Sequence, residues 1–128
     1  MDGVTQHDPL PQHEFAEELG AAGIMLMPTA YPEICSNNIL QSLASGTPVV
    51  TTGNLGSAKE WLKHGKNAML TRFHPQDYIV YQVEMIRNAI KVLSDAKLHK
   101  RMIDSARRTK VLTWDDVGGK WNKEMVKL

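Results

Sequence analysis

An acidic residue, a serine and several amide side chains lie close together in segment 31–50, where they could form an anion-binding site. Glu33 stands in a loop that begins at Pro32, and Ser36 is a good N-cap for the short helix that follows. The N-terminus of a helix carries unpaired N–H groups and the positive end of the helix dipole, which suits it to a phosphate group. A nucleotide-diphosphate site is therefore the leading hypothesis for this segment.

The helix after Ser36 has an apolar side and a polar side. Its apolar positions share one face at helical spacing, namely Ile39, Leu40, Leu43 and Ala44. Its polar positions share the other, namely Asn37, Gln41 and Ser45, with Asn38 beside Gln41. Gly46 can supply a left-handed stop, and Pro48 prevents continuation. Gln41 would then reach a ribose attached to a diphosphate at the helix N-terminus, although an ordinary amphipathic helix with a solvated polar face fits the pattern equally well.

Composition restricts the class of protein. The chain has 128 residues, 42% of them hydrophobic, which suits one globular domain with its own core. Its net charge of +1 argues against nucleic-acid binding driven by bulk electrostatics. The single Cys35 excludes an intramolecular disulfide and is compatible with a reducing compartment. The absence of a membrane-span pattern or signal-peptide pattern in this sequence leads us to expect a cytoplasmic location.

Strand-like and helical segments alternate in residues 1–74. Residues 24–27 form a continuous apolar run, as in a parallel strand buried on both faces. Residues 49–52 and 68–71 are expected to be further strands, and residues 3–6 could be the end of another. Helices are expected at about 12–19, 36–45 and 58–63. This alternation predicts an α/β fold with a parallel sheet and flanking helices.

Residues 75–128 are expected to form a helical tail of the same single domain. An apolar face repeats at helical spacing in its first helix and is most simply explained by packing: Ile79, Val83, Ile86, Ile90 and Leu93. Asp95 or Ser94 could cap a second helix, and Thr113 is a good N-cap for the last one. Local packing of Trp114 in that last helix is favoured over docking on a part of a larger protein.

Ligands of parallel sheets bind beyond the carboxyl ends of the strands. The loops after Met27 and Thr52 lie at those ends. We therefore expect Glu33, Ser36 and residues 53–57 to converge on one crevice.

In this order, the segments resemble the C-terminal half of the retaining glycosyltransferases of GT-B family 4. The corresponding residues stand here as Pro28-Thr29, Glu33, Gln41, Leu43-Ala-Ser-Gly46-Thr-Pro48-Val-Val50, Gly56-Ser57-Ala-Lys-Glu60, Asn67-Ala68 and Pro75-Gln-Asp77. The match covers nearly the whole chain and does not indicate which sugar is used. The resemblance implies a Rossmann-like parallel sheet that is part of a donor-binding domain.

The resemblance also implies roles for particular residues. Glu33 corresponds to the motif acid that faces the donor sugar, so it is the implied catalytic residue. The implied donor-binding residues are Cys35, Ser36, Asn37, Asn38, Gln41, Gly53, Gly56 and Ser57, with the amides around Ser36 cradling the diphosphate. From its own pattern, Cys35 is interpreted as a small packing residue.

Gln41 is a departure from the family, which normally has an acid here to hold the ribose hydroxyls. A carboxylate accepts from two vicinal hydroxyls, whereas an amide offers one acceptor and one donating end. Donor affinity would fall by about 1 kcal/mol per altered hydrogen bond.

A second departure concerns what usually precedes these segments in the family: an acceptor-binding domain, then strand–helix units with a basic pair for the diphosphate. The chain has no candidate region for either, and only Arg72 and Lys59 are candidate local cations. We therefore expect a fragment or split remnant that is inactive alone, because transfer needs donor, acceptor and leaving-group stabilisation in one closed cleft.

The resemblance implies a nucleotide-diphospho-sugar as donor substrate and a glycan or lipid-linked acceptor, bound through a missing N-terminal domain, in polysaccharide synthesis. It implies no metal or other cofactor, and the histidines lack metal-ligand spacing. Peripheral membrane association of the full-length enzyme is compatible with such an acceptor. The alternatives are a non-catalytic nucleotide-binding or assembly module whose exposed sheet edge pairs with a partner, and a regulatory nucleotide sensor.

Overall fold

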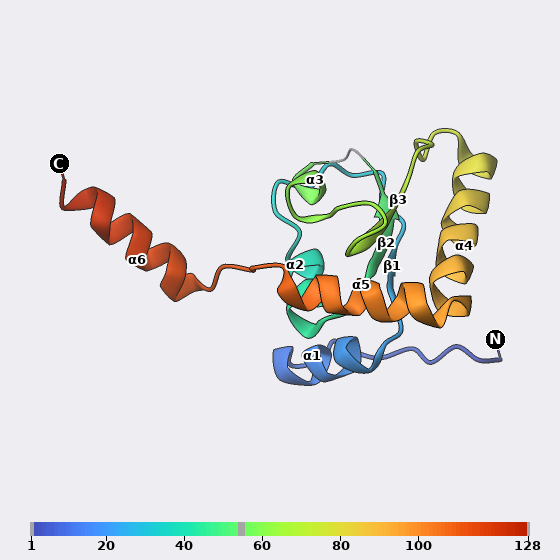
Figure 1. Ribbon diagram of the computed structural model, residues 1–128, viewed down its shortest axis with the longest axis horizontal. Coiled ribbons are helices and arrows are strands. Elements are labelled where there is room, and N and C mark those ends of the chain that lie inside the picture. Colours follow the sequence, from blue (N-terminus) through green and yellow to red (C-terminus); the bar gives the residue numbers. More distant parts are fainter. Residues whose placement is uncertain (1, 54–55, 128) are drawn as a thin grey trace.

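A computed structural model describes residues 2–53 and 56–127. Its centre is a parallel sheet of β1 (Met25–Met27), β2 (Val49–Thr52) and β3 (Ala68–Thr71), in the order β1-β2-β3. The helices are α1 (Gln12–Ala21), α2 (Asn37–Ser45), α3 (Ala58–Trp61), α4 (Tyr78–Ser94), α5 (Ala96–Arg108) and α6 (Trp114–Met125). Figure 1 shows α2 and α3 on one side of the sheet and α4 on the other. The predicted α/β fold with a parallel sheet is confirmed.

The sheet is built around β2, whose four side chains are all buried. In register, Leu26 of β1 lies opposite Val50 of β2, which lies opposite Met69 of β3. Because side chains alternate along a strand, Val50 packs towards α4 with Tyr81 and Met85, whereas Val49 packs towards α2.

Two expectations about strands are wrong. Leu26 is half-exposed, because β1 is an edge strand that pairs only with β2 within the described residues. Residues 3–6 form no strand and are exposed to solvent, with no neighbouring strand in the described part of the chain to pair with them. A continuous apolar run therefore identified β1 as a strand but did not establish that both of its faces are covered.

Helix α2 ends where the sequence predicted, but its buried face only partly matches the predicted apolar face. Gly46 adopts a left-handed conformation with φ of 81°, and its N–H donates to the Leu43 carbonyl. Ile39 and Leu43 are buried, but Ser42 occupies the third buried position and Ala44 is exposed. The Ser42 hydroxyl donates to the Thr47 carbonyl at 2.9 Å, which satisfies the buried polar group.

The N-caps of the two C-terminal helices, α5 and α6, are formed by residues that the sequence offered for this role. The Asp95 carboxylate accepts from the N–H groups of Lys97 and Leu98 at the start of α5. Thr113 and Asp116 exchange hydrogen bonds in a capping box at the start of α6, and the bonds from the Thr113 backbone and hydroxyl lower the pKa of the Asp116 carboxyl.

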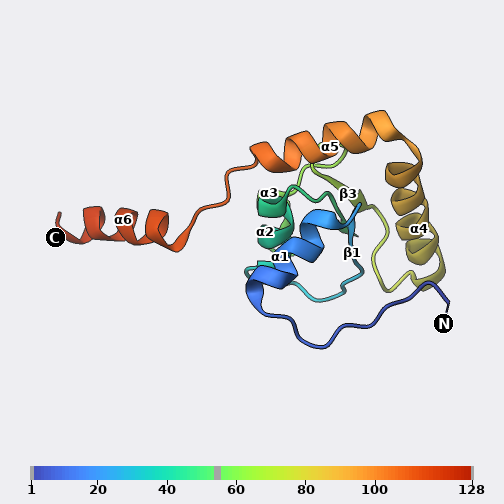
Figure 2. The ribbon, with the colours of Figure 1, turned by 90° about the horizontal axis from the view of Figure 1, so that it is seen from below.

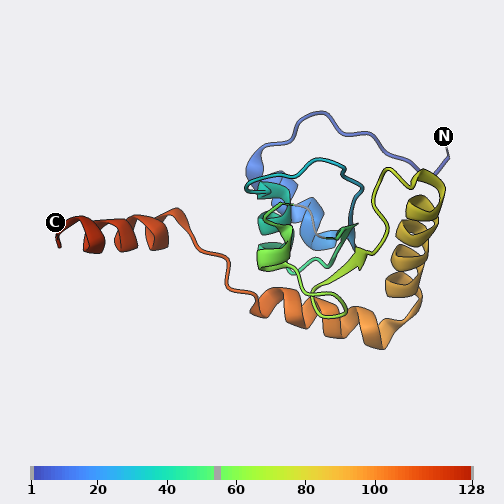
Figure 3. The ribbon, with the colours of Figure 1, turned by 90° about the horizontal axis from the view of Figure 1, so that it is seen from above.

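Helix α6 projects from the rest of the molecule in all three views (Figures 1, 2 and 3). It has no buried residue, and Trp114 is 88% exposed, so the prediction that Trp114 packs locally is wrong. Within the described residues, no helix combines the length and apolar character needed to cross a membrane.

Helix α4 exposes the apolar face that was predicted to pack. Ile79, Val83, Ile86, Ile90 and Leu93 are all exposed, and the buried residues are instead Tyr81, Glu84, Met85, Asn88 and Val92. Both sets repeat at helical spacing, so periodicity alone could not tell which one faces the sheet.

Two neighbouring residues of α4 provide a test of this orientation. Met85 is 4% exposed and Ile86 is 57% exposed. We expect Met85→Ala to lower the free energy of unfolding by about 2–5 kcal/mol, because it leaves a cavity, and Ile86→Ala to change it by less than about 0.5 kcal/mol. Urea unfolding of both variants measures the difference, and equal losses would show that the outer face is packed in solution.

Candidate functional site

A small pocket lies beyond the carboxyl ends of β1 and β2. Its volume is about 10 Å³, enough for one water molecule. It is lined by Met27, Thr29, Tyr31, Glu33, Ser36, Ile39, Thr51, Thr52, Ser57 and Ala58. The expected convergence of Glu33, Ser36 and Ser57 is thus observed, whereas Gly53 does not line the pocket. Residues 54 and 55 of the same expected crevice lie outside the described residues.

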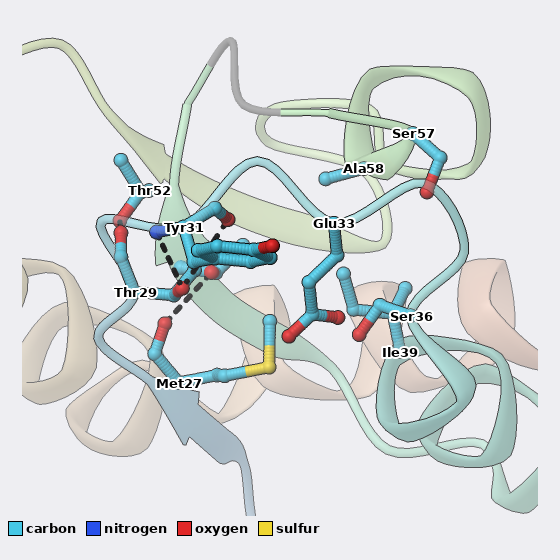
Figure 4. A pocket seen from close by; sticks show the side chains of 10 residues that line it. Met27, Thr29, Tyr31, Glu33, Ser36, Ile39, Thr52, Ser57 and Ala58 are labelled. Carbon is cyan, nitrogen blue, oxygen red and sulfur yellow. Dashed lines mark hydrogen bonds between the residues drawn. The ribbon is translucent and has the colours of Figure 1, made fainter.

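The side chain of Glu33 points into this pocket. In Figure 4 its carboxylate lies in the gap between Met27 and Ser36. The Glu33 backbone is held on both sides, because its N–H donates to the Tyr31 carbonyl and its own carbonyl accepts from the Ser57 N–H, each at 3.0 Å. The position of the Glu33 backbone, from which the side chain projects, is therefore fixed by these two contacts.

Gly56 is the residue that brings the loop after β2 against Glu33. It has a φ of +51°, and a Cβ atom at this position would overlap the backbone of Glu33. Only glycine permits both the left-handed conformation and this close approach.

Two serine hydroxyls in the pocket have no hydrogen-bond partner within the described residues. Ser36 is 5% exposed and Ser57 is 8% exposed, and both hydroxyl oxygens are fully buried. Buried polar groups are normally paired with protein or water, so orphaned hydroxyls indicate a place for a water molecule or a polar ligand.

The predicted capping bond of Ser36 is not formed. Ser36 is the N-cap residue of α2, but its hydroxyl accepts no bond from a helix amide, and no side chain of the described residues caps this end. Its side chain is directed into the pocket instead. The first N–H groups of α2 are consequently left without the usual side-chain acceptor.

The remaining predicted donor-binding residues of this helix line a second, larger cavity. Cys35, Asn37, Asn38 and Gln41 contribute to a groove of about 790 Å³, a volume in the range of small-molecule sites. The groove is completed by Leu10, Gln12, Phe15, Leu40, Ala44, Trp61, Val111, Leu112, Thr113, Trp114 and Val117. Cys35 is exposed, so its interpretation as a packing residue is wrong. The first turn of α2 thus separates the Glu33 pocket from this groove, which we call the Gln41 groove.

Glu84 is a buried carboxylate that sequence reasoning did not single out. It accepts from the N–H groups of Arg72 at 2.8 Å and Phe73 at 3.2 Å, and from Arg72 Nε at 3.2 Å. Burial alone would raise its pKa, but these hydrogen bonds outweigh burial and leave the pKa of Glu84 below its ordinary value. The available signal was its helical spacing from Tyr81 and its place beside Met85, on the face of α4 that is buried. Arg72, a candidate cation for a diphosphate, is paired with Glu84 instead.

No cluster of three or more His, Cys, Asp or Glu residues that could hold a metal ion occurs in residues 2–53 and 56–127.

Comparison with known proteins finds one matching family and a similar solved structure. The family described as "Glycosyl transferases group 1" matches residues 1–95. Among solved structures, the chain is similar to the crystal structure of Anabaena Alr3699/HepE in complex with UDP-glucose, with a TM-score of 0.66 and 20% sequence identity. That similarity covers 88% of this chain and 29% of the other, so the chain spans less than a third of that protein's length. Comparison with the curated proteins gives no match.

Two glycines separate the effect of backbone strain from the effect of the contact with Glu33. Gly56 and Gly65 both have positive φ, but a Cβ atom at Gly65 meets no atom within 4 Å. We expect Gly65→Ala to cost about 1–2 kcal/mol of unfolding free energy from strain alone, and Gly56→Ala to cost more because the Glu33 loop must move. Urea unfolding and NMR shifts of the Glu33 amide measure this, and equal costs with an unmoved Glu33 signal would contradict it.

Glu84→Gln should alter stability in a pH-dependent way. The folded-state pKa of Glu84 is lowered, so its carboxylate stabilises the fold above its unfolded pKa of about 4.3, and this contribution is lost as pH falls through the folded pKa. We expect Glu84→Gln to lose about 1–3 kcal/mol at pH 7 and much less at the acid end. Urea midpoints of the variant, the parent and Glu18→Gln, an exposed control on α1, would test this. A loss independent of pH would contradict it.

Proposed function

Because the chain belongs to the group 1 glycosyltransferase family, we propose that it is part of the donor-binding domain of a transferase that uses a nucleotide-diphospho-sugar. One observation carries the proposal: the uncapped N-terminus of α2 lies between the Glu33 pocket and the Gln41 groove. A donor of this class has a diphosphate between a sugar and a nucleoside, which is the same order of parts. The similar solved structure holds UDP-glucose, which supports the donor class.

The three parts of the donor would use three parts of the site. The diphosphate would sit at the N–H groups around Ser36, where the helix dipole favours negative charge. The ribose would extend into the Gln41 groove, where Asn37, Asn38 and Gln41 offer amide groups. The Glu33 pocket is too small for a hexose, so the sugar would lie over its mouth, with hydroxyl groups directed at Glu33 and Ser36.

In the intact enzyme, transfer would break the bond between the anomeric carbon and the diphosphate oxygen. The electron pair would stay on the diphosphate, where the α2 amides stabilise the developing charge. An acceptor hydroxyl would form the new bond with retention of configuration and pass its proton to the departing diphosphate oxygen. Glu33 would orient the sugar. The helix amides would bind the diphosphate of the donor without a metal.

The acceptor side of the reaction would come from another part of a longer protein. We propose a glycan or lipid-linked acceptor, as in polysaccharide synthesis, with peripheral membrane association of the full-length enzyme. The present chain would bind donor but would not catalyse transfer alone, because its described residues offer no acceptor-binding domain and Arg72 is already paired.

A second candidate function is a non-catalytic assembly module derived from the same fold. The open edge of β1 and the exposed apolar face of α4 favour it, because both are surfaces that another chain could cover. The experiment below distinguishes the two functions.

Calorimetric titration and thermal unfolding with UDP and UDP-glucose test donor binding. At a free concentration of 100 times its Kd, a ligand raises the free energy of unfolding by about 2.7 kcal/mol. We expect Gln41→Ala to weaken both ligands, because it removes the ribose contact. Glu33→Gln should weaken UDP-glucose towards the affinity of UDP, because Glu33 acts on the sugar, and Glu18→Gln should change neither.

Failure of both ligands to bind the parent chain would contradict the proposed donor site. Light scattering is the companion measurement. Stable oligomers together with no nucleotide binding would favour the assembly module, and a monomer that binds UDP would count against it.

A further inference from the structure

Two hydrogen bonds that meet at Thr52 connect α4 to the loop that carries Glu33. Thr52, the last residue of β2, has its Oγ1 atom 2.5 Å from the Thr29 carbonyl oxygen and 2.8 Å from the Tyr81 hydroxyl. Thr52 is 1% exposed and Tyr81 is 6% exposed. Thr29 opens the Glu33 loop, which we define as residues 29–35.

The direction of these hydrogen bonds follows from what each group can do. A carbonyl oxygen only accepts, so the single hydroxyl proton of Thr52 is donated to Thr29. Tyr81 must then be the donor to Thr52 Oγ1. The order is therefore Tyr81 to Thr52 to Thr29, and each bond polarises the next in a buried environment.

Two local hydrogen bonds within the loop lead from Thr29 to Glu33. The Tyr31 N–H donates to Thr29 Oγ1 at 3.1 Å, and the Glu33 N–H donates to the Tyr31 carbonyl at 3.0 Å. On the far side, the Glu33 carbonyl accepts from Ser57. Hydrogen bonds thus link Glu33 to β2 and α4 on one side and to the loop after β2 on the other.

Apolar packing contributes little to holding this loop. Its two large apolar side chains, Tyr31 and Ile34, are exposed, Ile34 by 94%. With few buried apolar contacts, the loop's position depends on its hydrogen bonds, and the bond from Thr52 to the Thr29 carbonyl joins it to the buried strand β2.

We infer that Tyr81 and Thr52 are positioning residues, which fix the Glu33 loop through the Thr29 carbonyl and so set the direction of the Glu33 carboxylate. Neither residue needs to touch a donor for this role. Its consequence for ligand affinity rests on the proposed function, but its consequence for the loop does not. Helix α4 thereby becomes part of the support of the pocket, although its other residues lie away from it.

The first test uses the free chain and requires no ligand. Amide hydrogen exchange is measured for Tyr31 and Glu33 in Tyr81→Phe and Thr52→Val, which remove the hydroxyl groups, and in Thr52→Ser, which keeps one. We expect about tenfold faster exchange at these amides in Tyr81→Phe and Thr52→Val, and near-parental exchange in Thr52→Ser.

The matched control is Val92→Ala, which removes buried side-chain atoms from the same face of α4 and has no hydrogen bond to the loop. Val92→Ala should lower global stability while the ratio of exchange at Glu33 to exchange at core amides of β2 stays unchanged. Unchanged Glu33 exchange in Thr52→Val would overturn the inference. The inference would also be overturned if the exchange rate of the Glu33 amide rose only in proportion to the loss of global stability, and by the same amount in Val92→Ala.

The second test measures UDP-glucose and UDP affinities by calorimetry in the same variants. Tyr81→Phe should weaken UDP-glucose about five- to tenfold and UDP by less than about twofold, because the loop positions the sugar end. Equal weakening of both ligands would overturn the positioning role. If the parent chain binds neither ligand, the proposed function fails, and hydrogen exchange alone decides whether Tyr81 and Thr52 hold the loop.

Discussion

A buried hydroxyl must find an acceptor, and this constraint organises the carboxyl edge of the sheet. All four side chains of β2 are buried, and two of them are threonines. Thr51 donates to the Met27 carbonyl at 2.7 Å, and Thr52 donates to the Thr29 carbonyl. Because both carbonyls belong to the end of β1 and the loop that follows, the central strand fixes where that loop begins.

The same constraint identifies the groups that are left for a ligand. Ser42, Thr51 and Thr52 all donate to protein carbonyls, whereas Ser36 and Ser57 are also buried but have no partner in the described residues. The two unsatisfied hydroxyls line one pocket with Glu33, beside a helix end without a side-chain cap. The two hydroxyls are therefore available to a water molecule or a polar ligand in the pocket. One further buried group, Asn88 Nδ2 of α4, also lacks a partner in the described residues.

Local signals in the sequence were sufficient for most of the framework. The stop at Gly46 and the N-cap at Thr113 each depend on a few neighbouring residues and are confirmed, and of the two caps offered for α5 the structure uses Asp95. The run of β-branched residues in Val49–Thr52 also predicted strand β2 correctly. The convergence of Glu33, Ser36 and Ser57 followed from the rule that loops at the carboxyl ends of parallel strands meet.

The errors concern contacts between distant segments. Helix α4 carries two apolar faces, and only packing against β2 and β3 decides that Met85 is buried and Ile86 exposed. The Ser36 hydroxyl was expected to cap α2, but the position of the loop turns it into the pocket. Glu84 was missed because its partners, the amides of Arg72 and Phe73, become neighbours only when α4 folds back onto the end of β3.

The separation of the two cavities bears on the glutamine at position 41. Under the proposed function, Gln41 acts on the nucleoside end from α2, whereas the sugar end depends on a loop held by Thr52, Tyr81 and Ser57. These supports share no hydrogen bond with the Gln41 side chain in the described residues. Under that proposal, a glutamine where the resemblance implies an acid would weaken the hold on the ribose and leave the Glu33 loop in place. A glutamine at position 41 is therefore compatible with an intact sugar end of the site.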